Sequence, residues 1–126
     1  MSIVLDSGAL IALERNDRPM WTALKLTALG NQDIVMPNAA LSQVWHGAPR
    51  QARLSSALNY CVLASFDAVA RAVGELCGRA RTRDIVDAQV AIVAATQGEV
   101  LYTSDPGDMR RLLLAYKRGM PAIVRC

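Results

Sequence analysis

Apolar residues occur along this chain in short runs that are separated by polar and turn-forming residues. Five mostly apolar runs predict short buried strands at 2–5, 34–36, 61–64, 100–103 and 122–124. Longer segments predict helices at 9–13, 17–29, 39–45, 51–60, 67–77, 85–97 and 108–117, with an Arg-rich connector at 78–82. Because strands alternate with helices, the pattern predicts an α/β fold with a mostly parallel sheet.

The most apolar segment of the chain follows Asp84. From Ala88 to Ala95, seven of eight residues are apolar, and Gln89 is the exception. A helix that is apolar on nearly all sides lies inside the core. Asp84 is in position to cap this helix, Asp87 lies in its first turn, and a glycine at position 98 ends it. The sequence therefore predicts a buried helix that begins at two acidic residues.

Other acidic residues follow predicted strands directly. Asp6 comes after the first strand, Asp67 follows the third, and Asp105 follows the fourth. In a parallel α/β sheet, the ends of strands and the beginnings of the following helices share one edge, where ligands bind. We therefore expect Asp6, Asp87 and Asp105 to lie close together. The helix after the second strand should bring Gln43 to the same edge.

Length and composition limit the class of protein. The 126 residues predict a single domain spanning 1–126, and 52% of them are hydrophobic. No apolar run reaches the roughly 18 residues of a membrane span, so no membrane partner is expected. The first residues lead into a strand and lack the features of a signal peptide. The three cysteines are isolated, which argues against a disulfide framework or zinc site and favours the cytoplasm.

The positive charge of the chain comes almost entirely from arginine. The formal charge is +3, with twelve arginines and two lysines. Arginine binds phosphate through paired hydrogen bonds, so an Arg-rich surface suits nucleic acid, and Arg83 is a candidate RNA contact. The same arginines fit an ordinary solvated surface equally well, because a net charge of this size identifies no partner.

A cluster of carboxylates has direct chemical consequences. Two carboxylates about 4 Å apart repel by roughly 4 kcal/mol at an effective dielectric constant near 20. Three in one cleft therefore require a proton or a cation among them. Oxygen ligands favour Mg²⁺ or Mn²⁺. These ions activate water and bind phosphoryl oxygens, which is the chemistry of phosphodiester hydrolysis.

Three segments resemble the acidic motifs of PIN-domain ribonucleases, in particular the VapC-like toxins of type II toxin–antitoxin pairs. They are Ile-Val-Leu-Asp-Ser-Gly-Ala-Leu around Asp6, Asp-Ile-Val-Asp-Ala-Gln-Val-Ala around Asp87, and Tyr-Thr-Ser-Asp-Pro-Gly-Asp-Met around Asp105. The resemblance covers essentially the whole chain. It implies a PIN-like three-layer fold, in which helices flank a mostly parallel five-stranded sheet. It also implies that these three residues are the catalytic and metal-binding carboxylates.

The activity implied by this resemblance is that of a toxin. The resemblance to this family implies an Mg²⁺- or Mn²⁺-dependent endoribonuclease that hydrolyses RNA phosphodiester bonds. A homodimer and a cognate VapB-like antitoxin that inhibits the nuclease are also implied. Gln43, Asp84, Ser104 and Asp108 are expected beside the metal ligands.

One position departs from the family pattern. Gln43 stands where the family usually has a second acid, a Glu. An amide can accept a hydrogen bond from a metal-bound water, but it brings no charge and cannot act as a general base. The alternative function is therefore a catalytically weakened PIN-fold module that binds a partner.

Simpler roles and other folds fit parts of the sequence. Asp6, Asp84 and Asp108 could serve as helix caps, and Asp105 could belong to a turn. His46 is the only histidine, which excludes a metal-free mechanism with two histidines from one chain. A phosphoacceptor receiver would need paired acids after the first strand, and a haloacid-type phosphatase would need a second Asp where this chain has glycine.

Overall fold

The five strands of the protein form one parallel sheet. The computed structural model describes all residues from 1 to 126. The strands are β1 (Ile3–Leu5), β2 (Ile34–Pro37), β3 (Val62–Ala64), β4 (Val100–Thr103) and β5 (Ala122–Arg125). Their order is β3-β2-β1-β4-β5, and every neighbouring pair is parallel. This topology confirms the predicted α/β class.

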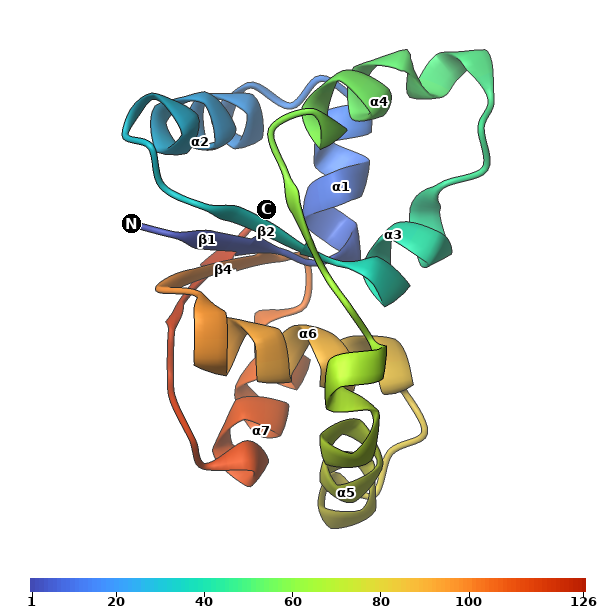
Figure 1. Ribbon diagram of the computed structural model, residues 1–126, viewed down its shortest axis with the longest axis vertical. Helices are drawn as coiled ribbons and strands as arrows, with labels where there is room; N and C mark the ends of the chain where they lie inside the picture. The colour runs from blue at the N-terminus through green and yellow to red at the C-terminus, as the bar shows by residue number, and fades with distance from the viewer.

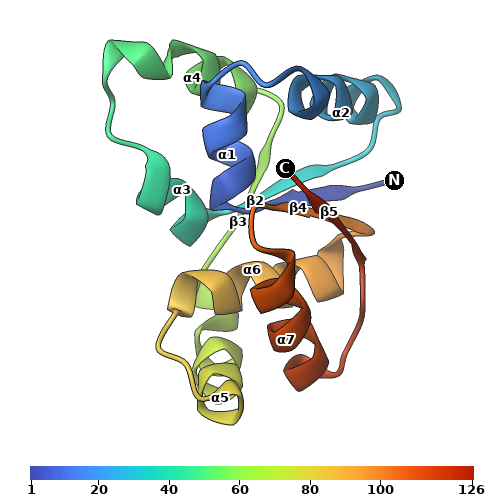
Figure 2. The same ribbon diagram turned by 180° about the vertical axis from the view of Figure 1, so that it is seen from behind.

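Helices cover the two faces of the sheet. They are α1 (Ser7–Glu14), α2 (Arg18–Leu29), α3 (Asn38–Val44), α4 (Ala52–Leu58), α5 (Ala70–Ala80), α6 (Ile85–Gln97) and α7 (Pro106–Tyr116). Short 3₁₀ turns at Pro49–Gln51 and Asp67–Val69 precede α4 and α5. Helices α1, α2 and α4 lie on one side of the sheet, α5, α6 and α7 lie on the other, and α3 stands at the edge of the sheet where β2 ends (Figure 1). The reverse view in Figure 2 shows the same three layers.

The centre of the core lies between the sheet and α6. Every residue of α6 from Ala88 to Ala94 is buried, which confirms the prediction of a buried helix. Truncation of a fully packed side chain such as Ile92 to Ala would cost roughly 2–5 kcal/mol. No helix has the length and apolar content needed to cross a membrane.

A glycine at the end of α6 allows close packing rather than a left-handed turn. Gly98 has φ −120°, which any residue can adopt. A Cβ atom there would collide with Cγ2 of Val4 in β1. The end of α6 can therefore lie directly against the central strand.

The beginning and end of two helices differ from the sequence-based prediction. Asp105, not Asp108, caps α7, because Asp105 Oδ1 accepts a hydrogen bond from Asp108 N at 3.2 Å. Pro106 then occupies the first turn, where its missing N–H is tolerated. Helix α5 continues through Gly78 to Ala80, so much of the expected connector is helical. Arg81 ends this helix in the left-handed conformation, with φ 56°.

Candidate active site

The sheet and α6 bring four acidic residues to one edge. Asp6 follows β1, Asp105 follows β4, and Asp84 and Asp87 stand at the start of α6. Strands β2 and β3 lie on one side of β1, and β4 and β5 lie on its other side. The order of the strands therefore reverses between β1 and β4. Ligands of open α/β sheets bind at this kind of switch point. Asp6 is near enough to Asp87 and to Asp105 for their charges to interact, but the three do not form one group that could hold a metal ion, so the expected set of three carboxylates is not assembled.

Asp6 is the most rigidly held of these carboxylates. It is only 5% exposed. Its Oδ1 accepts from Ser7 N, and its Oδ2 accepts from Thr103 Oγ1, both at 2.6 Å. Burial raises the pKa of Asp6, and the nearby charges of Asp84 and Asp105 act in the same direction, whereas the two hydrogen bonds lower it. Asp6 also caps α1, so its structural and chemical roles coincide.

Thr103 links two of the acids, and the sequence analysis missed it. Its buried hydroxyl donates to Asp6 and accepts from Asp105 N at 3.0 Å. One side chain at the end of β4 therefore sets the position of the residues that follow β1 and β4. The available signal was a polar residue at the end of an apolar strand, two residues before Asp105.

The strongest electrostatic perturbation is at Asp87. Its pKa is raised to about 7, first by burial and then by the charges of Asp84 and Asp6. A side-chain hydrogen bond with Asp84 and the charge of Asp108 act in the same direction. Asp84 also caps α6, because its Oδ1 accepts from Asp87 N at 3.0 Å. Asp87 is thus partly protonated at neutral pH unless a cation reduces the negative charge around it.

The donor set at this edge suits a hard divalent cation. No group of three Asp, Glu, His or Cys side chains is close enough to hold one metal ion. Mg²⁺ commonly binds through one or two carboxylates and keeps several waters, so it does not require such a group. The charge of Asp6 acts on Asp87 and the charge of Asp105 acts on Asp6, so these are the two pairs of carboxylates that could hold such an ion. The raised pKa of Asp87 reflects the repulsion that a cation would relieve.

Gln43 lies beside this edge, as its predicted position on the helix after β2 requires. Ser7 Oγ donates to Gln43 Oε1 at 2.6 Å, and Ser7 directly follows Asp6. This bond uses one lone pair of the amide oxygen. The amide nitrogen of Gln43 donates to no atom of the chain, and the side chain is exposed. The neutral amide therefore joins α3 to the start of α1.

A glycine allows α1 to approach the loop that carries Asp105. A Cβ atom on Gly8 would collide with the Oγ and Cβ atoms of Ser104 and would lie 2.9 Å from its backbone nitrogen. Gly8 has no positive φ, so close approach is what requires glycine here. Ser104 is held from its other side by Arg125 Nη1, which donates to its carbonyl oxygen at 3.2 Å.

The remaining candidates from the sequence lie on the outer rim. Asp108 is exposed, and its charge contributes to the raised pKa of Asp87. Arg83 is exposed one residue before the cap of α6, where a bound phosphate could reach it. Asp67 is exposed in the turn before α5 and is not among the charges that raise the pKa of Asp6 or Asp87.

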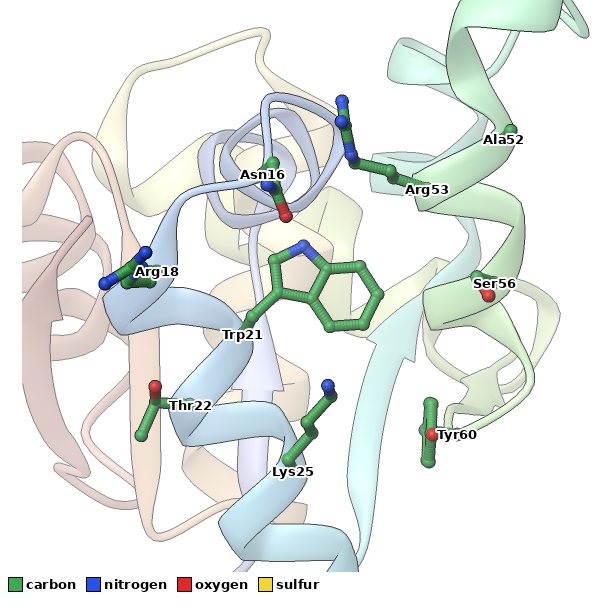
Figure 3. A pocket seen from close by; sticks show the side chains of 9 residues that line it. All are labelled: Asn16, Arg18, Trp21, Thr22, Lys25, Ala52, Arg53, Ser56 and Tyr60. Carbon is green, nitrogen blue, oxygen red and sulfur yellow. The ribbon is translucent and has the colours of Figure 1, made fainter.

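Cavities lie on both sides of Gln43. One, of about 510 Å³, includes Phe66 and Ile85 in its lining, and the other, of about 280 Å³, includes Arg15 and Arg50. A larger cavity of about 620 Å³ lies away from the acids, between α2 and α4. Figure 3 shows the Trp21 indole at its centre. We place the chemistry at the acidic edge, because the perturbed carboxylates are there and the larger cavity has none.

Comparisons with known proteins agree on the fold. No protein-family model matches the chain, and no curated protein matches it in sequence. The fold is similar to a chain in the crystal structure of VapBC2 from Rickettsia felis bound to a DNA fragment from their promoter. The TM-score is 0.73 at 17% sequence identity, and the match covers 100% of this chain and 99% of the other. The chain has a PIN-like fold. At this identity the likeness concerns the fold alone.

Proposed function

We propose that this protein is a cytoplasmic, VapC-like endoribonuclease toxin that depends on Mg²⁺ or Mn²⁺. It hydrolyses RNA phosphodiester bonds at Asp6, Asp87 and Asp105. The observation that carries this proposal is Asp87, a carboxylate whose pKa is raised to about 7 at the ligand-binding edge of a PIN-like fold. A strongly perturbed carboxylate with acidic neighbours is typical of catalytic sites.

Asp6, Thr103 and Asp87 have different roles in the proposed hydrolysis. When bound, a divalent cation supplies positive charge for the phosphoryl oxygens and lowers the pKa of water. Asp6 provides a fixed ligand, because Ser7 and Thr103 orient its two oxygens. Thr103 also orients the backbone at Asp105. Asp87 accepts the proton of the attacking water on its carboxylate, which the positive charge of the bound cation keeps ionised.

An RNA cleavage assay tests this function. Purified protein should cut single-stranded RNA with Mg²⁺ or Mn²⁺ and stop when EDTA is added. Protein carrying Asp87→Asn and purified in the same way controls for contaminating nucleases. Equal cleavage by the two proteins, or full cleavage in EDTA, would contradict the assignment.

The partners proposed for this toxin are a cognate VapB-like antitoxin and a second copy of the chain. The structural neighbour is a VapBC2 complex. Apolar side chains on and near α2 and α4 are open to solvent, since Leu26 is 64%, Leu29 79% and Tyr60 46% exposed. An apolar surface of this kind marks a site of association. A monomer in light scattering at micromolar concentration would refute the homodimer. An antitoxin encoded beside the toxin should co-purify with it and stop RNA cleavage.

A second candidate function is a PIN-fold module with weakened catalysis. The observation in its favour is Gln43, which has no charge and gives one oxygen lone pair to Ser7. Under this alternative, calorimetry would detect little binding of Mn²⁺, and RNA would remain uncut at any metal concentration. Cleavage that saturates with Mn²⁺ would instead support the enzyme.

A further inference from the structure

A cavity between α3, α6 and the turn after β3 adjoins the acidic edge. Its volume is about 510 Å³, which is within the usual range for small-molecule sites. Phe66, Ile85 and Val86 give it apolar walls, and Asn38 and Gln43 give it amides. It lies beside the carboxylates, because Ile85 follows the cap of α6 and Gln43 contacts the residue after Asp6.

A buried amide behind this cavity supports the residues that line it. Gln89 is completely buried, and its Nε2 donates to Asn38 Oδ1 and to Ala64 O, both at 3.1 Å. Its Oε1 accepts from Ala39 N, also at 3.1 Å. Phe66 N donates to the same Asn38 oxygen at 3.0 Å. Gln89 therefore fastens α3 and the turn after β3 to α6, which fixes Asn38 and Phe66 relative to each other.

These bonds determine which atom of Asn38 is free. A backbone N–H can only donate, so the Asn38 atom that faces Phe66 N must be oxygen. That oxygen receives two hydrogen bonds from inside the protein and has no further lone pair. The amide nitrogen of Asn38 makes no hydrogen bond within the chain. The cavity thus has an aromatic ring and a fixed hydrogen-bond donor on one wall.

We propose that this cavity binds one unpaired base of the RNA substrate beside the bond that is cut. The inference rests on the proposed ribonuclease function and adds its nucleotide subsite. Proteins recognise single-stranded RNA by stacking bases on aromatic rings and by hydrogen-bonding their edges. Phe66 provides the ring. The free group of Asn38 can only donate, so a bound base must turn an acceptor atom toward it, and uracil has two carbonyl oxygens that can take this place.

Binding of short RNAs in EDTA tests the subsite without cleavage. Fluorescence anisotropy measures the affinity of labelled hexamers of adenylate, cytidylate and uridylate. Asn38→Asp keeps an oxygen for Phe66 N and Gln89 but replaces the free donor with an acceptor. We expect the affinity ratio of the uridylate to the adenylate hexamer to fall about fivefold, because a carboxylate repels the two carbonyl oxygens of uracil but accepts a hydrogen bond from the exocyclic amino group of adenine.

The added charge needs its own control. Ser42→Asp places a carboxylate on the same cavity wall and leaves the Asn38 donor in place. It should weaken all three hexamers by the same factor and leave their ranking unchanged. Phe66→Leu removes the stacking surface and should weaken all three about tenfold. If Asn38→Asp fails to fold by circular dichroism, Phe66→Leu decides the question.

The outcomes separate this inference from the proposed function. A uridylate-to-adenylate ratio that is unchanged in folded Asn38→Asp overturns the subsite, even if the wild-type protein cuts RNA. Unchanged affinity in Phe66→Leu overturns it as well and leaves the cavity to an apolar side chain of a protein partner. A wild-type protein that neither binds nor cuts RNA overturns the ribonuclease and the subsite together.

Discussion

The acidic edge and the groove between α2 and α4 differ in almost every property. The edge has smaller cavities, but its polar side chains are fixed by hydrogen bonds that join α1, α3, α6 and β4. The groove has the larger cavity and exposed apolar side chains such as Leu29. Within it, Lys25 Nζ lies 5.7 Å from the centre of the Trp21 ring.

This difference shows why the size of a cavity does not locate the chemistry. Burying carboxylates near one another costs stability, and the raised pKa of Asp87 records that cost. A groove with exposed apolar side chains beside it and no perturbed carboxylate instead provides a surface for a partner. We therefore expect substitutions at the edge to change catalysis and metal binding. Substitutions in the groove should change association.

The largest expected effect is on the rate of RNA cleavage. Asp87→Asn removes the proposed base and one negative charge and should lower the rate about 10²–10⁴-fold at saturating Mn²⁺. Tyr60→Ala in the groove should change it less than about twofold. Initial rates on one single-stranded RNA measure both. A similar loss of cleavage rate in the two variants would contradict the distinction between the acidic edge and the groove.

The next effect concerns the approach of α1 to the loop after β4. Gly8→Ala forces Ser104 away and should destabilise the protein by about 1–3 kcal/mol, with reduced cleavage because Asp105 follows Ser104. Gly74→Ala is the matched control, because a Cβ there meets nothing within 4 Å. As a helix-interior substitution in α5, it should stabilise by about 0.5–1 kcal/mol. Denaturant unfolding measures both changes in the free energy of unfolding. A change of the same sign in the two variants would contradict this explanation.

The sequence predicted those features of the site that depend on local patterns, and it did not predict contacts between residues that are far apart in the chain. The positions of Asp6, Asp87 and Asp105 follow from strand ends and a helix start, which local patterns reveal. The hydrogen bond from Thr103 to Asp6 joins residues 97 positions apart, so no periodic pattern in the sequence predicts it. The cap at Asp105 was missed because two acids compete for that role.

The amide network shows the same limit. The sequence marked Gln89 as the one polar residue in an apolar segment, but its partners lie on α3 and at the end of β3. Only the packed fold brings those groups together. The close approach of Gly8 to Ser104 likewise arises from tertiary packing, which no local sequence pattern predicts.

A smaller effect should appear in the pH dependence of stability without metal. The folded-state pKa of Asp87 is raised to about 7, so the folded protein binds this proton more tightly than the unfolded chain. The protonated Asp87 side chain adds to the free energy of unfolding. This contribution is fully present below the pKa of Asp87 in the unfolded chain, and it is lost as the pH rises through about 7. Asp87→Asn in EDTA should therefore be the more stable protein at pH 8, by about 1–2 kcal/mol, because partial exposure screens the effect. The two proteins should converge near pH 4, and urea titrations across this range measure the difference.

The smallest expected effect is at Gln43. Gln43→Glu keeps an oxygen for Ser7 Oγ and adds a negative charge at the edge. It should tighten Mn²⁺ binding by about 1 kcal/mol and lower the melting temperature of the metal-free protein. Ser42→Glu, one residue earlier on α3, controls for the charge alone. Equal Mn²⁺ affinity in wild type and Gln43→Glu would mean that this side chain does not act on the metal.

Thermal unfolding with and without Mn²⁺ tests most directly whether the acidic edge holds a divalent cation. At about 100 times the dissociation constant, Mn²⁺ should stabilise the wild-type protein by about 2.7 kcal/mol, or roughly 5–10 °C in melting temperature. Asp87→Asn, which is nearly isosteric, should fold and lose most of this shift. The same shift in both proteins, or none in the wild type, would contradict the assignment of the site.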